Sequence, residues 1–255
     1  MTAELQLIAV PGIPLVQAGD DLPGLIVQGL AAAGVALRDH DVMVIAQKIV
    51  SKSEGRFVDL TSIVPSARAE ELALVVRKDP RLVEVILSES RRVVRAVKDV
   101  LIVEHRLGLI MANAGVDQSN VADPHGPPLA LMLPQDPDAS ASRIREELRR
   151  RLGCSVGVVI NDSFGRPWRL GTVGVAIGCS GLPAVLDLRG DHDLFGRTLQ
   201  TTVVAYADEI AAAASLFMGQ SIEARPVILV RGLKQDENHQ SARALLRPVD
   251  EDLFR

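Results

Sequence analysis

Aromatic side chains are scarce in this chain. Phe, Trp and Tyr together make up 3% of its 255 residues. Proteins that bind single-stranded nucleic acid usually stack successive bases on aromatic rings, so this scarcity argues against an extended base-stacking surface. The formal net charge is −4, and no overall positive field attracts nucleic acid or an anionic membrane. A local basic pocket is compatible with both observations.

Cysteine is also rare. The chain has two, Cys154 and Cys179, without a CxxC pair, and its five histidines are scattered without an HxxxH pair. These absences argue against a structural zinc site. We expect two buried free thiols in a reducing compartment.

Long apolar runs are missing. None reaches the roughly 18–20 residues that span a bilayer. The N-terminal segment lacks the basic region and long apolar segment of a secretory signal. We therefore expect a cytoplasmic protein without a membrane partner.

Both common nucleotide-binding motifs are absent as well. There is no GxxxxGK[ST] loop, and the glycines at 171, 174 and 178 are spaced GxxGxxxG rather than GxGxxG. A nucleotide bound by this chain would need another kind of site.

What the chain does contain is a mixture of strand and helix patterns. The predicted strands are 5–10, 42–46, 101–105, 107–111, the start of 155–171, and 225–232. The predicted helices are 20–34, two segments of 66–96 divided at Asp79 and Pro80, 141–153, and 198–220. Because 101–105 and 107–111 read as a hairpin and no regular β-α-β alternation occurs, we predict an α+β fold with mixed or antiparallel sheets. A composition change near 134–140 suggests two lobes within a single domain covering 1–255.

Polar residues follow apolar strands in three places. These are Pro11-Gly12-Ile13-Pro14, NAGVDQSN at 113–120, and NDSFGRPWR at 161–169, which we interpret as a polar turn. Carboxylate, amide and hydroxyl oxygens are the ligands that Mg²⁺ and Mn²⁺ prefer. Asp117 and Asp162 are therefore candidate ligands of one such ion, held against phosphate oxygens as phosphoryl transfer requires.

Basic residues near these clusters are candidate anion contacts. Lys52, Arg166 and Arg169 would supply positive charge to a phosphate or carboxylate group. Spacing alone does not separate this hypothesis from plain polar turns, a solvated lysine and a surface Trp168.

Seven strings in a fixed order carry a family resemblance. They are PGIPLVQAGDDL, VSKSEGR, NAGVDQSNV, NDSFGRPWRLGTVGVAIG, DLFGR, ADEIAAAASLFMGQ and VILVRGL. From about residue 5 to the tail, the chain resembles the coenzyme F420-0:L-glutamate ligase family of γ-glutamyl ligases.

The resemblance implies a GTP-dependent amide ligase. It would add L-glutamate to F420-0 through an acyl phosphate, giving F420-1, GDP and phosphate, and would add further γ-linked glutamates. It also implies Mg²⁺ or Mn²⁺, with K⁺ as an additional candidate, the family's own α+β fold and an intertwined homodimer. We expect no C-terminal reductase-like domain.

The resemblance also implies roles for individual residues. The implied catalytic residues are Asp117, Asp162 and Arg166. The implied metal ligands are Asp117, Asp162, Ser163 and Gln220. The implied GTP contacts are Pro11, Gly12, Ile13, Pro14, Gln47, Lys52, Asn120, Leu216, Met218 and Gly219.

Two positions depart from the family pattern. Many members carry Thr-Asp-Thr where this chain has Asn161, Asp162 and Ser163, and often Glu where it has Gln220. A hydroxyl and an amide oxygen still serve as ligands, although Gln220 contributes no charge. Two alternatives remain open: a GTP-dependent ligase for another small carboxylate, and a non-catalytic protein that binds metal and nucleotide.

Overall fold

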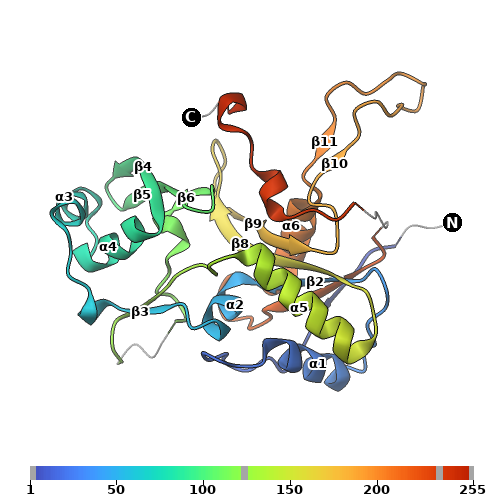
Figure 1. The fold of residues 1–255 in the computed structure, drawn as a ribbon, viewed down its shortest axis with the longest axis horizontal. Helices are drawn as coiled ribbons and strands as arrows, with labels where there is room; N and C mark the ends of the chain where they lie inside the picture. Colours follow the sequence, from blue (N-terminus) through green and yellow to red (C-terminus); the bar gives the residue numbers. More distant parts are fainter. Residues whose placement is uncertain (1–3, 122–125, 234–237, 253–255) are drawn as a thin grey trace.

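The computed structural model describes residues 4–121, 126–233 and 238–252. Its largest sheet is five-stranded and mixed (Figure 1). The strands, in spatial order, are β1 (Gln6–Ala9), β12 (Val227–Arg231), β2 (Val42–Ala46), β8 (Gly157–Gly165) and β9 (Thr172–Ser180). β2 and β8 run parallel and the other neighbours antiparallel. The predicted α+β class is therefore confirmed.

Helices cover both faces of this sheet. Met43 and Ile45 of β2 pack in one core with α1 (Leu22–Ala32) and α5 (Pro137–Leu152). Val42 and Val44 pack in a second core with α6 (Tyr206–Met218). Successive side chains of a strand point to opposite faces, which explains why a strand covered on both sides is apolar throughout.

Close packing of α6 depends on a glycine. A Cβ atom on Gly174 in β9 would lie 2.5 Å from the carbonyl oxygen of Ala211 and 2.7 Å from Oδ1 of Asn161. No side chain fits there, so the backbone of α6 packs directly against β9.

A smaller lobe has its own core. It contains α3 (Ala67–Val76), α4 (Pro80–Ser88) and the antiparallel sheet of β4 (Ser90–Val97), β5 (Val100–His105) and β6 (Ile110–Ala112). The β5–β6 pair confirms the predicted hairpin. The antiparallel strands β3 (Phe57–Asp59) and β7 (Leu129–Leu131) connect this lobe to the main body. The prediction of a single domain over 1–255 stays a prediction.

Two helix predictions were too long. The second helix of 66–96 ends at Ser88, and 90–97 is strand β4. Register shifts within β4 place Val93 and Ala96 against the same core, and that three-residue spacing imitates a helix. The helix predicted at 198–220 begins at Tyr206. The β-branched residues before it disfavour a helix, and they form β11 (Val203–Val204), which pairs with β10 (Leu186–Asp187).

Two further features differ from the sequence prediction near the cavity described below. Residues 161–165 continue β8 and pair with β9, so this part of NDSFGRPWR is strand and not turn. A helix, α2 (Gln47–Ser53), follows β2 directly. Its N-cap Ala46 makes no side-chain hydrogen bond, so the usual start signal of a helix is missing.

The β10–β11 ribbon extends away from the main body and carries the loop 188–202 at its end (Figure 1). No helix in the described residues is long and apolar enough to cross a membrane. Both cysteines are free thiols; Cys179 is buried as predicted, whereas Cys154 is only partly buried.

Candidate active site

A cavity of about 370 Å³ lies where the parallel strands β2 and β8 end. Five segments line it: the turn after β1, the end of β2 with the start of α2, Asn120, residues 161–163 of β8, and the end of α6 with the segment after it. The lining residues are Ile13, Pro14, Leu15, Val16, Ala46, Gln47, Lys48, Ile49, Lys52, Asn120, Asn161, Asp162, Ser163, Met218, Gly219, Gln220, Ser221, Ile222, Glu223, Ala224, Arg225 and Pro226. Ligands of α/β proteins commonly bind beyond the carboxyl ends of parallel strands.

Helix α2 presents two lysines one turn apart. Nζ of Lys48 lies 2.7 Å from Oδ2 of Asp117, and it donates to the carbonyl of Ser119 at 2.9 Å and to its Oγ at 3.1 Å. Nζ of Lys52 donates to the carbonyl of Asn120 at 2.6 Å. We call residues 117–120 the 117–120 loop. The two lysines hold this loop, which follows the smaller lobe, against the main body.

Asp117 is well supplied with hydrogen-bond donors. The backbone N–H of Ser119 donates to its Oδ1 at 2.8 Å, and Ser119 Oγ donates to its Oδ2 at 2.9 Å. Burial favours the neutral acid, but the hydrogen bonds from Lys48 and Ser119 outweigh burial and hold the pKa of Asp117 below its ordinary value. Asp117 is therefore negatively charged near neutral pH.

Asp162 has the opposite surroundings. Its carboxylate accepts a hydrogen bond of 2.8 Å from the backbone N–H of Ser163. Within the described residues, no basic side chain lies within ion-pair distance of it. Burial and, to a lesser extent, the charge of Asp117 raise the pKa of Asp162 to about 6, while the hydrogen bond from Ser163 and the charge of Lys48 oppose the rise. In this part of the described chain, the negative charge of Asp162 is not neutralised by a basic side chain, and it lies near the charge of Asp117. This arrangement suits a bound cation.

Ser163 and Gln220 place two more oxygens at this point. Ser163 Oγ donates to Oε1 of Gln220 at 2.8 Å, and Nε2 of Gln220 donates to Ser215 Oγ at 3.2 Å. Within the described chain, no three His, Cys, Asp or Glu side chains gather as a metal site. The predicted ligand set instead combines two carboxylates with a hydroxyl and an amide, a donor set that fits Mg²⁺ or Mn²⁺. Metal ligation remains a prediction.

The predicted GTP contacts divide into two groups. Those lining the cavity are Ile13, Pro14, Gln47, Lys52, Asn120, Met218 and Gly219. Pro11, Gly12 and Leu216 do not line it; all three are exposed, Leu216 to 84% of its surface. Their roles stay predictions.

Arg166 also lies outside the cavity lining. It is exposed, and its Nη1 donates to the carbonyl of Gly171 at 3.3 Å. Trp168 nearby is 86% exposed. The role predicted for Arg166 therefore requires a substrate that extends beyond the cavity, or a partner that covers this surface.

Lys48 is the main site residue that sequence reasoning missed. Its signal was its position four residues before Lys52, which places both on one face of a helix. Because no helix was predicted over residues 47–53, this spacing did not predict that the two lysines lie together. Asn161 is buried and also lines the cavity, with its Nδ2 3.4 Å from Sδ of Met218; the sequence marked it as a departure from the family pattern.

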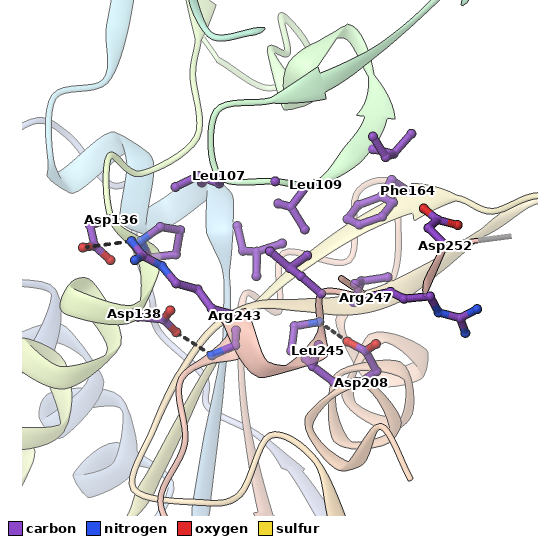
Figure 2. Close-up of a pocket in the computed structure, with 18 residues that line it drawn as sticks. Leu107, Leu109, Asp136, Asp138, Phe164, Asp208, Arg243, Leu245, Arg247 and Asp252 are labelled. Atoms are coloured by element: carbon purple, nitrogen blue, oxygen red, sulfur yellow. Dashed lines mark hydrogen bonds and ion pairs between the residues drawn. The ribbon is translucent and has the colours of Figure 1, made fainter. Parts of the chain in front are cut away.

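A second cavity of about 240 Å³ is lined by Phe164 of β8, Asp138 of α5, Asp208 of α6 and the C-terminal segment (Figure 2). Its carboxylates already have partners in the protein. Asp138 accepts from the backbone N–H groups of Cys179 and Ala242 at 2.9 and 2.8 Å, and Asp208 accepts from Ala176 at 2.9 Å. Two of these bonds join α5 and α6 to β9, and the bond from Ala242 joins the C-terminal segment to α5. We therefore assign the candidate active site to the larger cavity.

Comparison with known proteins identifies the family of this chain. The family described as F420-0:Gamma-glutamyl ligase matches residues 12–232. The chain therefore belongs to the F420-0:gamma-glutamyl ligase family, which confirms the family predicted from the sequence.

Relatives match over nearly the whole chain. The coenzyme F420:L-glutamate ligase of Methanothermobacter thermautotrophicus is 47% identical, over 98% of this chain and 99% of that protein. The protein of the same name from Methanopyrus kandleri is 46% identical, over 98% and 99%. That from Haloarcula marismortui is 40% identical, over 98% and 96%.

Proposed function

We propose that this chain is a coenzyme F420-0:L-glutamate ligase. The observation that carries the proposal is Asp162 in the lining of a cavity that also contains Lys48 and Lys52. Asp117 is not among the lining residues, but it is paired with Lys48 and its charge acts on Asp162. The chain is also similar over nearly its full length to proteins of that name. We further propose that it acts in the cytoplasm as a homodimer.

The proposed chemistry proceeds in two steps. A carboxylate oxygen of F420-0 attacks the γ-phosphorus of GTP, the bond to the bridging oxygen breaks, and GDP leaves with that oxygen. The α-amine of L-glutamate then attacks the acyl phosphate at carbon and loses a proton. Phosphate leaves with the former carboxylate oxygen, and an amide is formed. No protein nucleophile is required, and catalysis rests on positioning and charge neutralisation.

The side chains present suit these steps. Asp117, Asp162, Ser163 and Gln220 would hold Mg²⁺ or Mn²⁺, with K⁺ as an additional cation. When bound, such ions neutralise phosphate oxygens. Lys48 and Lys52 line the same cavity and supply positive charge to the phosphates of GTP, and Gln47, Met218 and Gly219 would contact the nucleotide.

The proposal is tested by incubating the protein with F420-0, L-glutamate, GTP and Mn²⁺ and measuring product mass. We expect F420-0 to gain one glutamyl residue, with further residues added in longer reactions. Asp162→Asn should abolish the product, whereas Asp187→Asn, an exposed carboxylate in β10, should not. GTP consumption without a glutamyl product would point to another acceptor carboxylate. Tight GTP binding without turnover on any acceptor would point to a non-catalytic protein.

A further inference from the structure

Lys48 forms the only ion pair of the 117–120 loop among the described residues. Its Nζ has three oxygen partners: Oδ2 of Asp117 at 2.7 Å, and the carbonyl and Oγ of Ser119 at 2.9 and 3.1 Å. An ammonium group has three N–H donors. All three are matched by oxygens of this loop, so Lys48 occupies the position that a small cation would take.

The carboxylate of Asp117 is correspondingly occupied. Its Oδ2 accepts from Lys48 and from Ser119 Oγ, and its Oδ1 accepts from the backbone N–H of Ser119. Both acceptor sites of Oδ2 are filled, so a metal ion that binds Oδ2 must displace Lys48 or Ser119 Oγ. Lys48 is the donor that gives way, because its positive charge is repelled by a metal ion at this oxygen, whereas Ser119 Oγ is uncharged.

Lys48 is also placed to leave Asp117 without leaving the site. It lines the same cavity as Lys52 and Asp162, and its charge acts on both of them. An ammonium group released from Asp117 would remain beside the space that phosphate groups occupy in the proposed reaction.

We infer that Lys48 is the counter-ion of Asp117 when no metal ion is bound, and that a divalent cation displaces Lys48 from Asp117 when it binds. Because Lys48 competes with the cation in this way, it weakens the affinity of the site for that cation. Lys48 is thus a positioning residue. This inference rests on the metal-binding part of the proposed function.

The test is the affinity for Mn²⁺ alone, without nucleotide, measured by calorimetry and by the electron paramagnetic resonance signal of free Mn²⁺. Lys48→Met removes the competitor and should tighten Mn²⁺ binding about tenfold, the effect expected for one charge-assisted hydrogen bond. Lys48→Arg keeps a competing cation and should stay within about twofold of the wild type on the same reasoning.

Lys52→Met is the matched control for charge. It removes a neighbouring lysine whose partner is the carbonyl of Asn120 and not a carboxylate, so Mn²⁺ binding should tighten clearly less than in Lys48→Met. Equal tightening in both variants would reduce the effect to overall charge and overturn the inference. Unchanged or weaker binding in Lys48→Met would also overturn it.

Thermal unfolding gives a second readout. In EDTA, Lys48→Met leaves Asp117 without its counter-ion, so its Tm should fall below that of the wild type, and excess Mn²⁺ should raise its Tm by more. If Lys48→Met does not fold in EDTA, Lys48→Gln takes its place, because it removes the positive charge beside Asp117 and keeps a polar side chain that can donate a hydrogen bond. It should tighten Mn²⁺ binding modestly, and an unchanged affinity would contradict the inference.

The product assay separates this inference from the proposed function. If the Mn²⁺ affinities follow the expected order but F420-0 gains no glutamate, the counter-ion role stands and the acceptor is wrong. If glutamate is added but the affinities do not follow that order, the ligase stands and the counter-ion role fails. A wild-type protein that binds no Mn²⁺ overturns the counter-ion role.

Discussion

Nζ of Lys52 donates a hydrogen bond of 2.6 Å to the backbone carbonyl of Asn120, which joins α2 to the 117–120 loop. Asn120 has a φ of +54°, a conformation that asparagine tolerates better than most residues. Lys52 thus holds an unusual backbone shape at the edge of the cavity, and it brings Asn120 to the predicted nucleotide position.

We therefore predict that Lys52→Met raises the KM for GTP by about tenfold, the loss expected for a charge-assisted contact. The KM for L-glutamate should change much less. Lys52→Arg should recover part of the loss, because the charge and a donor are kept. Steady-state kinetics with each substrate varied would measure this, and an unchanged KM for GTP would remove Lys52 from the nucleotide site.

We predict that Asp162 makes the free energy of unfolding of the metal-free protein depend on pH. Its pKa is about 6 in the folded chain, raised by burial and by Asp117. The folded protein therefore binds the proton more tightly than the unfolded chain does. The stabilisation is fully present below pH 4 and is lost as the pH rises through 6.

Urea unfolding of the wild type and of Asp162→Asn in EDTA, from pH 4 to pH 8, measures this loss. Asp162→Asn cannot ionise and should gain stability relative to the wild type as the pH rises. A difference between the two proteins that does not vary with pH would show that Asp162 titrates normally.

We predict that Gly174→Ala lowers the stability of the fold through steric overlap and not through a change in charge. Ala at this position would press its Cβ against the carbonyl of Ala211, and overpacking of this kind costs about 2 kcal/mol. The control is Gly165→Ala on the neighbouring strand, where a Cβ meets nothing within 4 Å. Tm should fall for Gly174→Ala and stay nearly unchanged for the control. Equal Tm values would mean that α6 can shift away from β9 at little cost.

We predict that removal of the Glu89 side chain, in the smaller lobe, causes a large loss of stability through the charges that surround it. This buried carboxylate lies 3.0 Å from Arg106, 3.3 Å from Arg56 and 3.5 Å from Nε2 of His105. Burial alone would raise the pKa of Glu89, but these partners hold it below its ordinary value.

Removing one member of a buried charge cluster leaves the others uncompensated, so Glu89→Ala should cost about 3 kcal/mol. Glu147→Ala removes an exposed carboxylate of α5, and its unfolding free energy should match that of the wild type within error. Urea unfolding at pH 7 compares them. Similar unfolding free energies for the two variants would mean that the Glu89 carboxylate does not stabilise the fold.

Much of the fold follows from local sequence rules, because strands covered on both faces are apolar and helix starts carry recognisable caps. Asp21 before α1 is one such cap, and it accepts a hydrogen bond from Gly24. The β5–β6 hairpin was predicted because two strand patterns, 101–105 and 107–111, lie one residue apart in the sequence. The missed elements depend on tertiary pairing: the polar end of β8 is a strand only because β9 lies beside it, and β4 is defined by its register with β5.

The candidate site was predictable in part from local sequence, through Asp117, Asp162 and Lys52. Asp117 and Asp162 stood out as carboxylates after apolar strands, and the structure brings them close enough for the charge of Asp117 to raise the pKa of Asp162. Lys48 did not stand out, because its meaning depends on α2 and on a loop 69 residues away. Long-range pairs of this kind are not encoded in local spacing.

The central claim is glutamate ligation through an acyl phosphate, and one isotope measurement tests it most directly. F420-0 labelled with ¹⁸O in its carboxylate is incubated with the protein, GTP, Mn²⁺ and L-glutamate, and the product and the released phosphate are analysed by mass spectrometry. The account predicts F420-0 with one added glutamyl residue and one ¹⁸O atom in each released phosphate. A glutamyl product with unlabelled phosphate would contradict the acyl phosphate, and labelled F420-0 recovered without glutamate would contradict the ligase.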